Sequence, residues 1–153
     1  MTTRRDALKH SAVVAGLLAA TGLFPTLARA SWTKSAFDAR SIADAVKAYG
    51  AGAAPAESKD VTLTAPDIAE NGAVVPMGVA TTLPNVKHLL LLVEKNPSAL
   101  VAKFDVSDAV EANFLTRAKM GQSSDVYAVA ITADGKALFA KKEVKVTLGG
   151  CGG

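Results

Sequence analysis

The sequence predicts an all-β fold, an antiparallel β-sandwich with one helix before it. The main observation is a series of about seven short strand-like segments after residue 60, separated by turn signals at regular spacing. The second observation is one stretch of helical periodicity, residues 35–49, ahead of them. About 123 residues remain after the predicted leader, which is enough for one domain with its own core.

Residues 1–30 predict a signal peptide that is cleaved from the mature protein. Arg4 and Arg5 stand side by side, an uncharged stretch rich in alanine and leucine covers residues 11–27, and Ala28-Arg29-Ala30 has the small-x-small pattern of a cleavage site. The paired arginines favour the twin-arginine route, so we expect a periplasmic protein. The apolar stretch is shorter than the roughly 20 residues that span a bilayer, so we expect no membrane anchor.

The net charge of +3 belongs to this leader. Its four basic residues and one acidic residue account for all of it, and the rest of the chain holds 13 residues of each sign. A mature protein without net charge gives no reason to expect nucleic acid or an anionic membrane as a partner. The twin-arginine route carries folded cargo and the sequence shows no cofactor motif, so we expect a protein partner that is acquired before export.

Residues 35–49 predict a helix with one apolar face. Five residues recur at the helical spacing on that face: Ala39, Ile42, Ala43, Val46 and Tyr49. Ser35 would cap the helix with Asp38 in its first turn, and Gly50 and Gly52 would end it. The predicted organisation is therefore a leader (1–30), a helix and linker (31–58), a β-sandwich domain (59–148) and a C-terminal arm (149–153).

The predicted strands follow in order along residues 61–64, 73–82, 86–94, 99–106, 113–118, 125–132 and a last strand that reaches Leu148. Asn71-Gly72 and Asp134-Gly135 are turn pairs between strand segments. Residues 113–118 fit a short strand and a helical turn equally well. Pro76 cannot donate a hydrogen bond to a sheet, so its strand is expected at an edge or at a bulge. Residues 89–93 are all apolar, which is consistent with a strand covered on both faces.

The last five residues, Gly149-Gly150-Cys151-Gly152-Gly153, hold the only cysteine of the chain. A single cysteine cannot form an internal disulfide, so its thiol is free, intermolecular or chemically employed. Glycine has no Cβ and no preferred local shape, so the pattern predicts a flexible arm. Five residues span roughly 16 Å when fully extended, which would let the thiol enter a cleft on another protein.

The sequence offers little that could make this protein an enzyme. His88 is the one histidine outside the leader, and its place beside leucines in a predicted strand favours a structural or surface role. No second histidine or cysteine could complete a zinc site, so no metal is expected. A Cys151–His88 dyad is conceivable, but a flexible arm does not hold a nucleophile rigidly. Lys141, Lys142 and Lys145 lie too far up the strand to activate the thiol, which suits a carrier whose reactivity is set inside a partner's pocket.

Several stretches together resemble one family. The tail follows Val144-Lys145-Val146-Thr147-Leu148, and two further stretches agree, Ile68-Ala69-Glu70-Asn71-Gly72-Ala73-Val74-Val75-Pro76 and Lys95-Asn96-Pro97. With the twin-arginine leader, essentially the whole chain resembles the SoxY family, the sulfur carriers of the periplasmic Sox sulfur-oxidation system.

The resemblance implies an immunoglobulin-like sandwich that forms a heterodimer with a SoxZ-type subunit. Cys151 matches the carrier cysteine, and Gly149, Gly150, Gly152 and Gly153 match its slim swinging arm. A SoxXA-type cytochrome is then expected to attach thiosulfate to Cys151 as an S-thiosulfonate. A SoxB-type hydrolase would release sulfate and leave a persulfide, and a sulfane dehydrogenase or another acceptor would process the remaining sulfur. No cofactor is expected other than this sulfur adduct.

Two other functions remain open from the residues. The protein could be an exported adaptor whose Cys151 only forms an intermolecular disulfide, for example in a disulfide dimer. The carboxylate of Gly153 could alternatively be activated as in ubiquitin-like carriers, but that activation needs ATP, which is scarce outside the cytoplasm.

Overall fold

A computed structural model describes residues 33–147 and six single residues nearer the N-terminus, at positions 4, 8, 10, 13, 16 and 17. The chain divides into two units, Met1–Trp32 and Thr33–Gly153, and the elements below belong to the second. The helices are α2 (Lys34–Phe37) and α3 (Ile42–Ala48). The strands are β1 (Ala56–Glu57), β2 (Val61–Thr64), β3 (Ile68–Ala69), β4 (Val75–Thr81), β5 (Val86–Val93), β6 (Leu100–Asp105), β7 (Asn113–Ala118), β8 (Ser124–Thr132) and β9 (Ala137–Val146).

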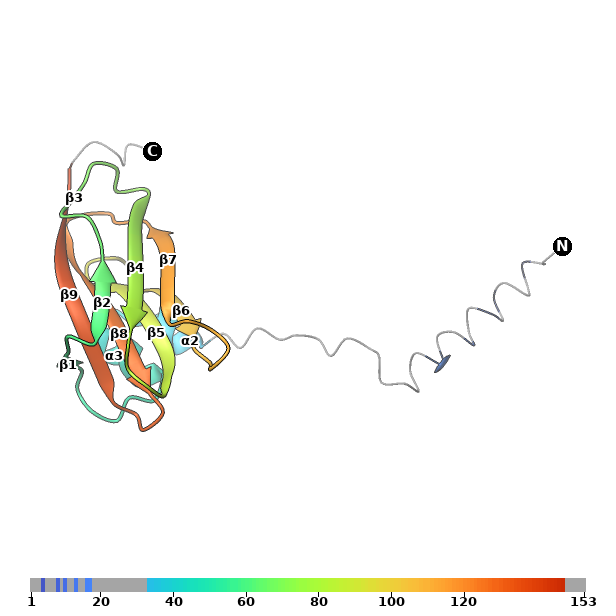
Figure 1. Cartoon of the computed structure of the whole chain (residues 1–153). Helices are drawn as coiled ribbons and strands as arrows, with labels where there is room; N and C mark the ends of the chain where they lie inside the picture. Colours follow the sequence, from blue (N-terminus) through green and yellow to red (C-terminus); the bar gives the residue numbers. More distant parts are fainter. Residues whose placement is uncertain are drawn as a thin grey trace. The chain divides into compact units, whose positions relative to one another are not determined.

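Two sheets pack against each other, which confirms the predicted immunoglobulin-like β-sandwich (Figure 1). The larger sheet has the order β1-β9-β8-β5-β6, and β3 also pairs with β9. The smaller sheet has the order β2-β4-β7. All pairs are antiparallel except the two short strands β1 and β3, which run parallel to β9. These two parallel pairs depart from the predicted purely antiparallel arrangement.

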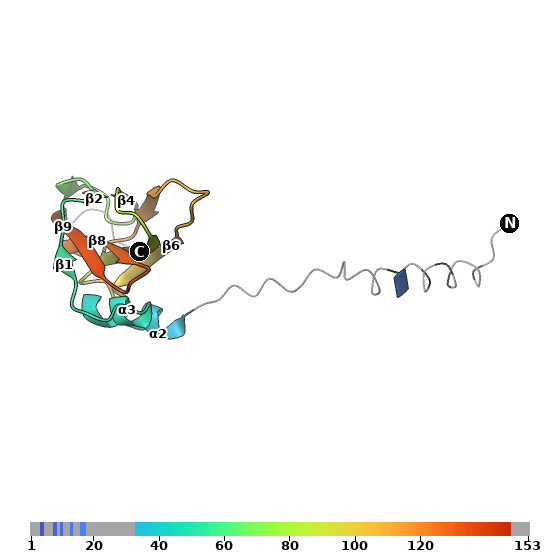
Figure 2. The same ribbon diagram turned by 60° about the horizontal axis from the view of Figure 1, so that its bottom comes forward.

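The sequence of β5 explains how the layers fit together. Leu89, Leu91 and Val93 belong to the core between the two sheets, whereas Leu90 and Leu92 belong to a second core under the helices. All five are fully buried. Side chains alternate between the faces of a strand, so an unbroken apolar run is what a strand covered on both sides requires. The helices therefore form a third layer on the outer face of the larger sheet (Figure 2).

The single predicted helix is divided into α2 and α3. Ser41 has an extended backbone, and its side chain accepts the N–H of Asp44 at 3.1 Å, so a new helix begins after it. Ser35, the predicted cap, lies inside α2 instead. Most of the predicted apolar face is confirmed, since Ala39 and Val46 are buried and Ile42 and Tyr49 pack against the core under the helices. Ala43 is the exception: it is exposed, and Ala45 is buried instead.

The end of α3 lies where the glycines predict it. Gly50 has a φ of +86°, a left-handed conformation that glycine adopts without a Cβ penalty. The N–H groups of Gly50 and Ala51 donate to the carbonyls of Lys47 and Val46, at 3.0 and 3.4 Å. This pair of bonds is a Schellman motif, and it turns the chain back toward the sheet.

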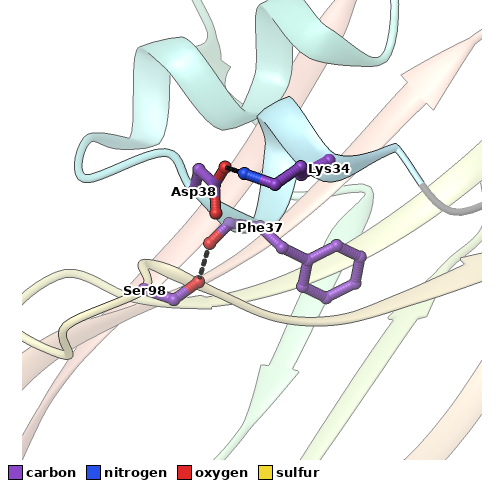
Figure 3. A network of polar contacts seen from close by, with 4 residues as sticks. All are labelled: Lys34, Phe37, Asp38 and Ser98. Atoms are coloured by element: carbon purple, nitrogen blue, oxygen red, sulfur yellow. Dashed lines mark hydrogen bonds and ion pairs between the residues drawn. The ribbon is translucent and has the colours of Figure 1, made fainter.

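The helical layer is fastened to the turn between β5 and β6. The hydroxyl of Ser98 donates to the carbonyl of Phe37 at 2.5 Å, and the Ala99 N–H donates to the carbonyl of Ala39 at 3.1 Å. An ion pair between Lys34 and Asp38, at 2.6 Å, lies across α2 in the same network (Figure 3). The ion pair is exposed and lies within the helical segment, so it contributes little. The two hydrogen bonds and the buried apolar core under the helices hold the layer in place.

The small sheet contains two outcomes that the sequence left open or placed wrongly. Residues 113–118 form a strand, β7, rather than a helical turn. β4, expected at an edge or at a bulge because of Pro76, is the central strand of its sheet and pairs with β7 without a register shift. The reason is local: β2 pairs with β4 only from Gly78 to Thr81, so Pro76 has a neighbour on one side only, Arg117 of β7.

In the part of the chain that the structure describes, no helix is both long and apolar enough to cross a bilayer.

Candidate functional site

Most residues of the predicted site lie outside the described part of the chain. These are Cys151, the arm residues Gly149, Gly150, Gly152 and Gly153, and Arg5 of the leader. Arg4 is described, as an exposed residue in helical conformation. The structure does describe the residues from which the arm departs, Lys145, Val146 and Thr147, which we call the arm root.

One side of the arm root is held by the segment around β3. The N–H of Lys145 donates to the carbonyl of Asp67 at 3.0 Å, and the N–H of Thr147 donates to the carbonyl of Ala69 at 3.1 Å. The Thr147 hydroxyl donates to the carbonyl of Glu70 at 3.3 Å. The backbone is therefore paired up to Thr147, one residue beyond the end of β9.

The opposite side of the arm root is held by the turns after β3 and β7. The hydroxyl of Ser123 accepts the N–H of Val146 at 2.9 Å. Gly72 packs directly against Val146, and a Cβ built on Gly72 would lie 2.8 Å from Val146 Cγ1 and 2.5 Å from the carbonyl oxygen of Met120. The N–H of Met120 also donates to the carbonyl of Gly72 at 2.7 Å. The point of departure of the arm is thus fixed from both sides.

Two of the three lysines of β9 are engaged in ion pairs. Lys142 donates to the carbonyl of Ala65 at 2.7 Å and lies 2.9 Å from the carboxylate of Asp67. Lys141 lies 3.6 Å from the carboxylate of Asp125. Lys142 thereby ties the loop before β3 to β9, which gives it a structural role close to the arm root.

His88 lies in a separate cluster with Asp105, Lys103 and Tyr49. Its Nδ1 and the Lys103 ammonium each lie 2.7 Å from Asp105 Oδ1, and its ring lies 5.6 Å from the ring of Tyr49. The Lys103 ammonium, more than any other group, holds the pKa of Asp105 below its ordinary value. Tyr49 caps the C-terminal end of α3, so the cluster joins the helical layer to β5 and β6. Within the described residues, no group of three histidine, cysteine, aspartate or glutamate side chains could hold a metal ion.

The contacts of the arm root were not predicted from the sequence. Asp67, Ala69 and Glu70 act through backbone carbonyls, which every residue type possesses, so their identities carry no signal. The one available signal was Gly72, which the sequence marked as part of a turn. The structure shows in addition that Gly72 is needed because two other segments approach it closely.

Comparison with known proteins places these features in context. A family model described as sulfur oxidation protein SoxY matches residues 46–151. The solved structure of the sulfur carrier protein SoxY from Chlorobium limicola f thiosulfatophilum is 36% identical, with a TM-score of 0.60 over 69% of this chain and 96% of that chain. A superoxide reductase (neelaredoxin) from Ignicoccus hospitalis is 18% identical, with a TM-score of 0.51 over 57% of this chain and 80% of that chain, a similarity of fold alone. Among curated proteins, none matches the chain.

Proposed function

The chain belongs to the SoxY family of sulfur oxidation proteins, and we propose on this basis that it carries sulfur intermediates covalently on Cys151. The observation that supports the proposal most directly is the extent of the family match, which runs from residue 46 through the cysteine itself. The similar solved structure is that of a sulfur carrier protein. The role proposed for Cys151 is to hold substrate, while catalysis takes place on other proteins.

Loading of the carrier is an oxidation. The Cys151 thiol and thiosulfate join through a new S–S bond to give an S-thiosulfonate, with release of one proton and two electrons. The electrons pass to a c-type cytochrome of the SoxXA type. Only the thiolate attacks sulfur, and a cysteine has an ordinary pKa near 8.5, so the partner's pocket has to favour ionisation.

Release of sulfate is a hydrolysis without electron transfer. Water attacks the terminal sulfonate sulfur, the S–S bond to that sulfur breaks, and sulfate and two protons leave. The product is a persulfide anion on Cys151, which keeps the remaining sulfane sulfur bound to the carrier. A SoxB-type hydrolase would perform this step, and a sulfane dehydrogenase or another acceptor would take the remaining sulfur.

The fixed arm root supports this division of labour. Thr147 is bonded to the backbone on one side and Val146 to Ser123 on the other, so the thiol departs from a defined point of the sandwich. Cys151 is the fourth residue after Thr147. A fully extended arm could therefore place Cys151 roughly 13 Å from Thr147. Because the arm would start from a fixed point and is short, a partner's active site has to lie close to the arm root.

Membership of the family implies in general a SoxZ-type partner, and we propose that the two subunits form the heterodimer that is exported. The paired Arg4 and Arg5 support export by the twin-arginine route to the periplasm, since that route accepts folded cargo. The partner would travel without a leader of its own.

Intact-mass measurement of the protein from thiosulfate-grown cells tests the proposal. We expect adducts that contain sulfur, confined to Cys151 and removed by reductant. A Cys151→Ser strain should lose thiosulfate oxidation while the heterodimer stays assembled under reducing conditions. An unmodified thiol throughout turnover, or full oxidation by the Cys151→Ser strain, would refute the proposal. Loss of assembly instead of chemistry would indicate an adaptor that works through an intermolecular disulfide.

A further inference from the structure

The outer face of the small sheet is hollowed at its centre. A groove of about 740 Å³ lies across β2, β4 and β7. Gly78, in the middle of the central strand, is one of its lining residues and is covered by the side chains of its two cross-strand neighbours. A Cβ at Gly78 would lie 2.7 Å from Leu115 Cδ2 and 3.3 Å from the Cβ of Thr64, the neighbours on either side. The walls of the groove include Pro66, Pro76 and Leu115.

Leu115 is conspicuous on this face because 80% of its surface is exposed. One exposed leucine is ordinary in a soluble protein. Here, however, Leu115 stands over a hollow whose other walls include the exposed Pro76 and the half-buried Pro66. Apolar side chains gathered around a depression are a common mark of a surface that another protein covers.

A cation stands at the same place. Arg117 lines the groove, lies opposite Pro76 on the neighbouring strand and is exposed. Within residues 33–147 it makes no ion pair with any carboxylate. A guanidinium that has no carboxylate partner among residues 33–147 and lies beside an apolar hollow fits a partner that presents an apolar side chain next to a carboxylate.

The groove is close to the arm root along the chain. Pro66, at the rim, is three residues from Ala69, whose carbonyl accepts the N–H of Thr147. Three residues span at most roughly 10 Å. Cys151 can reach roughly 13 Å from Thr147. A protein that occupies the groove therefore stands where the thiol can enter it.

We infer that this groove is the docking surface for the enzymes that load and unload Cys151, an inference that rests on the proposed function. The occupant is a transient partner that inserts an apolar side chain between Pro76 and Leu115 and pairs a carboxylate with Arg117. The contact that this occupant makes is brief. A carrier that serves several enzymes in turn needs such a contact, since each enzyme must leave before the next can bind.

Leu115→Asp in the full heterodimer tests the inference. The measurement is the rate at which the purified thiosulfate-oxidising cytochrome, with thiosulfate, converts Cys151 to its adduct, followed by intact mass. We expect at least a tenfold fall in this rate, because the charge opposes the apolar anchor. Arg117→Gln should also lower it, and Leu115→Met should keep it. Val110→Asp is the matched control, since Val110 is 45% exposed in the loop before β7 and lies outside the groove.

Two further readouts separate docking from other effects. A small thiol-reactive compound should modify Cys151 at the same rate in Leu115→Asp and in the unaltered protein, because the substitution does not change the arm. Heterodimer size should also be equal. Adduct formation at the unaltered rate in both Leu115→Asp and Arg117→Gln would overturn the inference. Separation of the two subunits in Leu115→Asp would also overturn it, because the groove would then bind the SoxZ-type subunit. Loss of self-association would overturn it as well, because the groove would then bind a second copy of this chain. If the unaltered protein carries no adduct, the proposed function itself fails.

Discussion

At the scale of single residues, Gly72 leaves the least room for change. A Cβ there would lie 2.5 Å from a backbone oxygen, and backbone cannot move aside as a flexible side chain can. We expect Gly72→Ala to lower the free energy of unfolding by about 1–3 kcal/mol, the usual cost of forcing atoms into a packed region. Urea denaturation followed by circular dichroism measures it.

Gly121→Ala is the matched control for Gly72→Ala. Gly121 belongs to the turn after β7 near the same end of the sandwich, and a Cβ there would meet no atom within 4 Å. Its effect should stay within about 0.5 kcal/mol. Equal stability of the two variants would contradict the close packing around Gly72.

Asp134, in the turn between β8 and β9, offers a pH-dependent prediction. The nearby Lys136 ammonium, at 2.7 Å, and then the Thr132 hydroxyl lower the pKa of Asp134 from 3.8 to about 2. A carboxyl whose pKa falls on folding stabilises the fold above its ordinary pKa and loses that contribution as the pH drops through about 2. Lys136→Met should therefore raise the pKa of Asp134 toward 3.8, as carboxyl chemical shifts against pH would show. An unchanged titration would contradict the assigned cause.

At the scale of elements, α3 depends on its cap. The Ser41 side chain accepts the Asp44 N–H, one of the donors that the first turn leaves without a partner. Ser41→Ala should cost about 1 kcal/mol in the free energy of unfolding, measured by thermal or urea denaturation. Ser35→Ala is the control, because Ser35 lies inside α2, is exposed and caps nothing. A larger loss of stability for Ser35→Ala than for Ser41→Ala would instead support the single helix, capped by Ser35, that the sequence predicted.

The elements that could be predicted are those whose signals are local. Six of the seven longer strands were expected because alternation and turn signals mark each one within a few residues. Residues 113–118 were left open between a strand and a helical turn, and the structure shows a strand there. β1 and β3 were missed because two residues cannot show a period, and because both form only against β9, far away in the sequence. The break before Ser41 was missed for a related reason. Helical spacing continues across it, and the tertiary contacts of Phe37 and Ala39 with the turn after β5 decide where α2 stops.

At the scale of the whole molecule, stability depends on the core between the two sheets, and the proposed recognition depends on the outer face of the small sheet. Leu91 is fully buried between the two sheets, whereas Leu115 is 80% exposed on the outer face. We expect Leu91→Ala to lower the free energy of unfolding by about 2–5 kcal/mol, through lost burial and the cavity left behind. Leu115→Ala should change it by less than about 0.5 kcal/mol. A large loss of stability in Leu115→Ala would mean that this residue belongs to the fold rather than to a docking surface.

The site was predictable only in its chemical part. A unique cysteine among glycines is visible in sequence, and so is its distance from the last strand. The contacts that fix Val146 and Thr147 were not predictable. They are made by backbone groups of residues 67–72 and by the Ser123 side chain, which are far from the arm root in the sequence. The groove was not predictable either. It needs Gly78, Leu115 and Thr64 on three adjacent strands in one register, and register is a property of the folded sheet.

β9 is paired along ten residues, with β8 on one side and with β1 and β3 on the other. In the proposed carrier, a partner that draws the thiol into its active site would pull on Thr147, and the pull would pass into this strand. A force along the strand axis loads many interstrand hydrogen bonds at once, in shear, whereas a force across the strand would open them one after another. In the proposed carrier, the strand that bears the cargo would thus also be the mechanical anchor of the sandwich, and repeated insertion and withdrawal of the thiol need not unravel it.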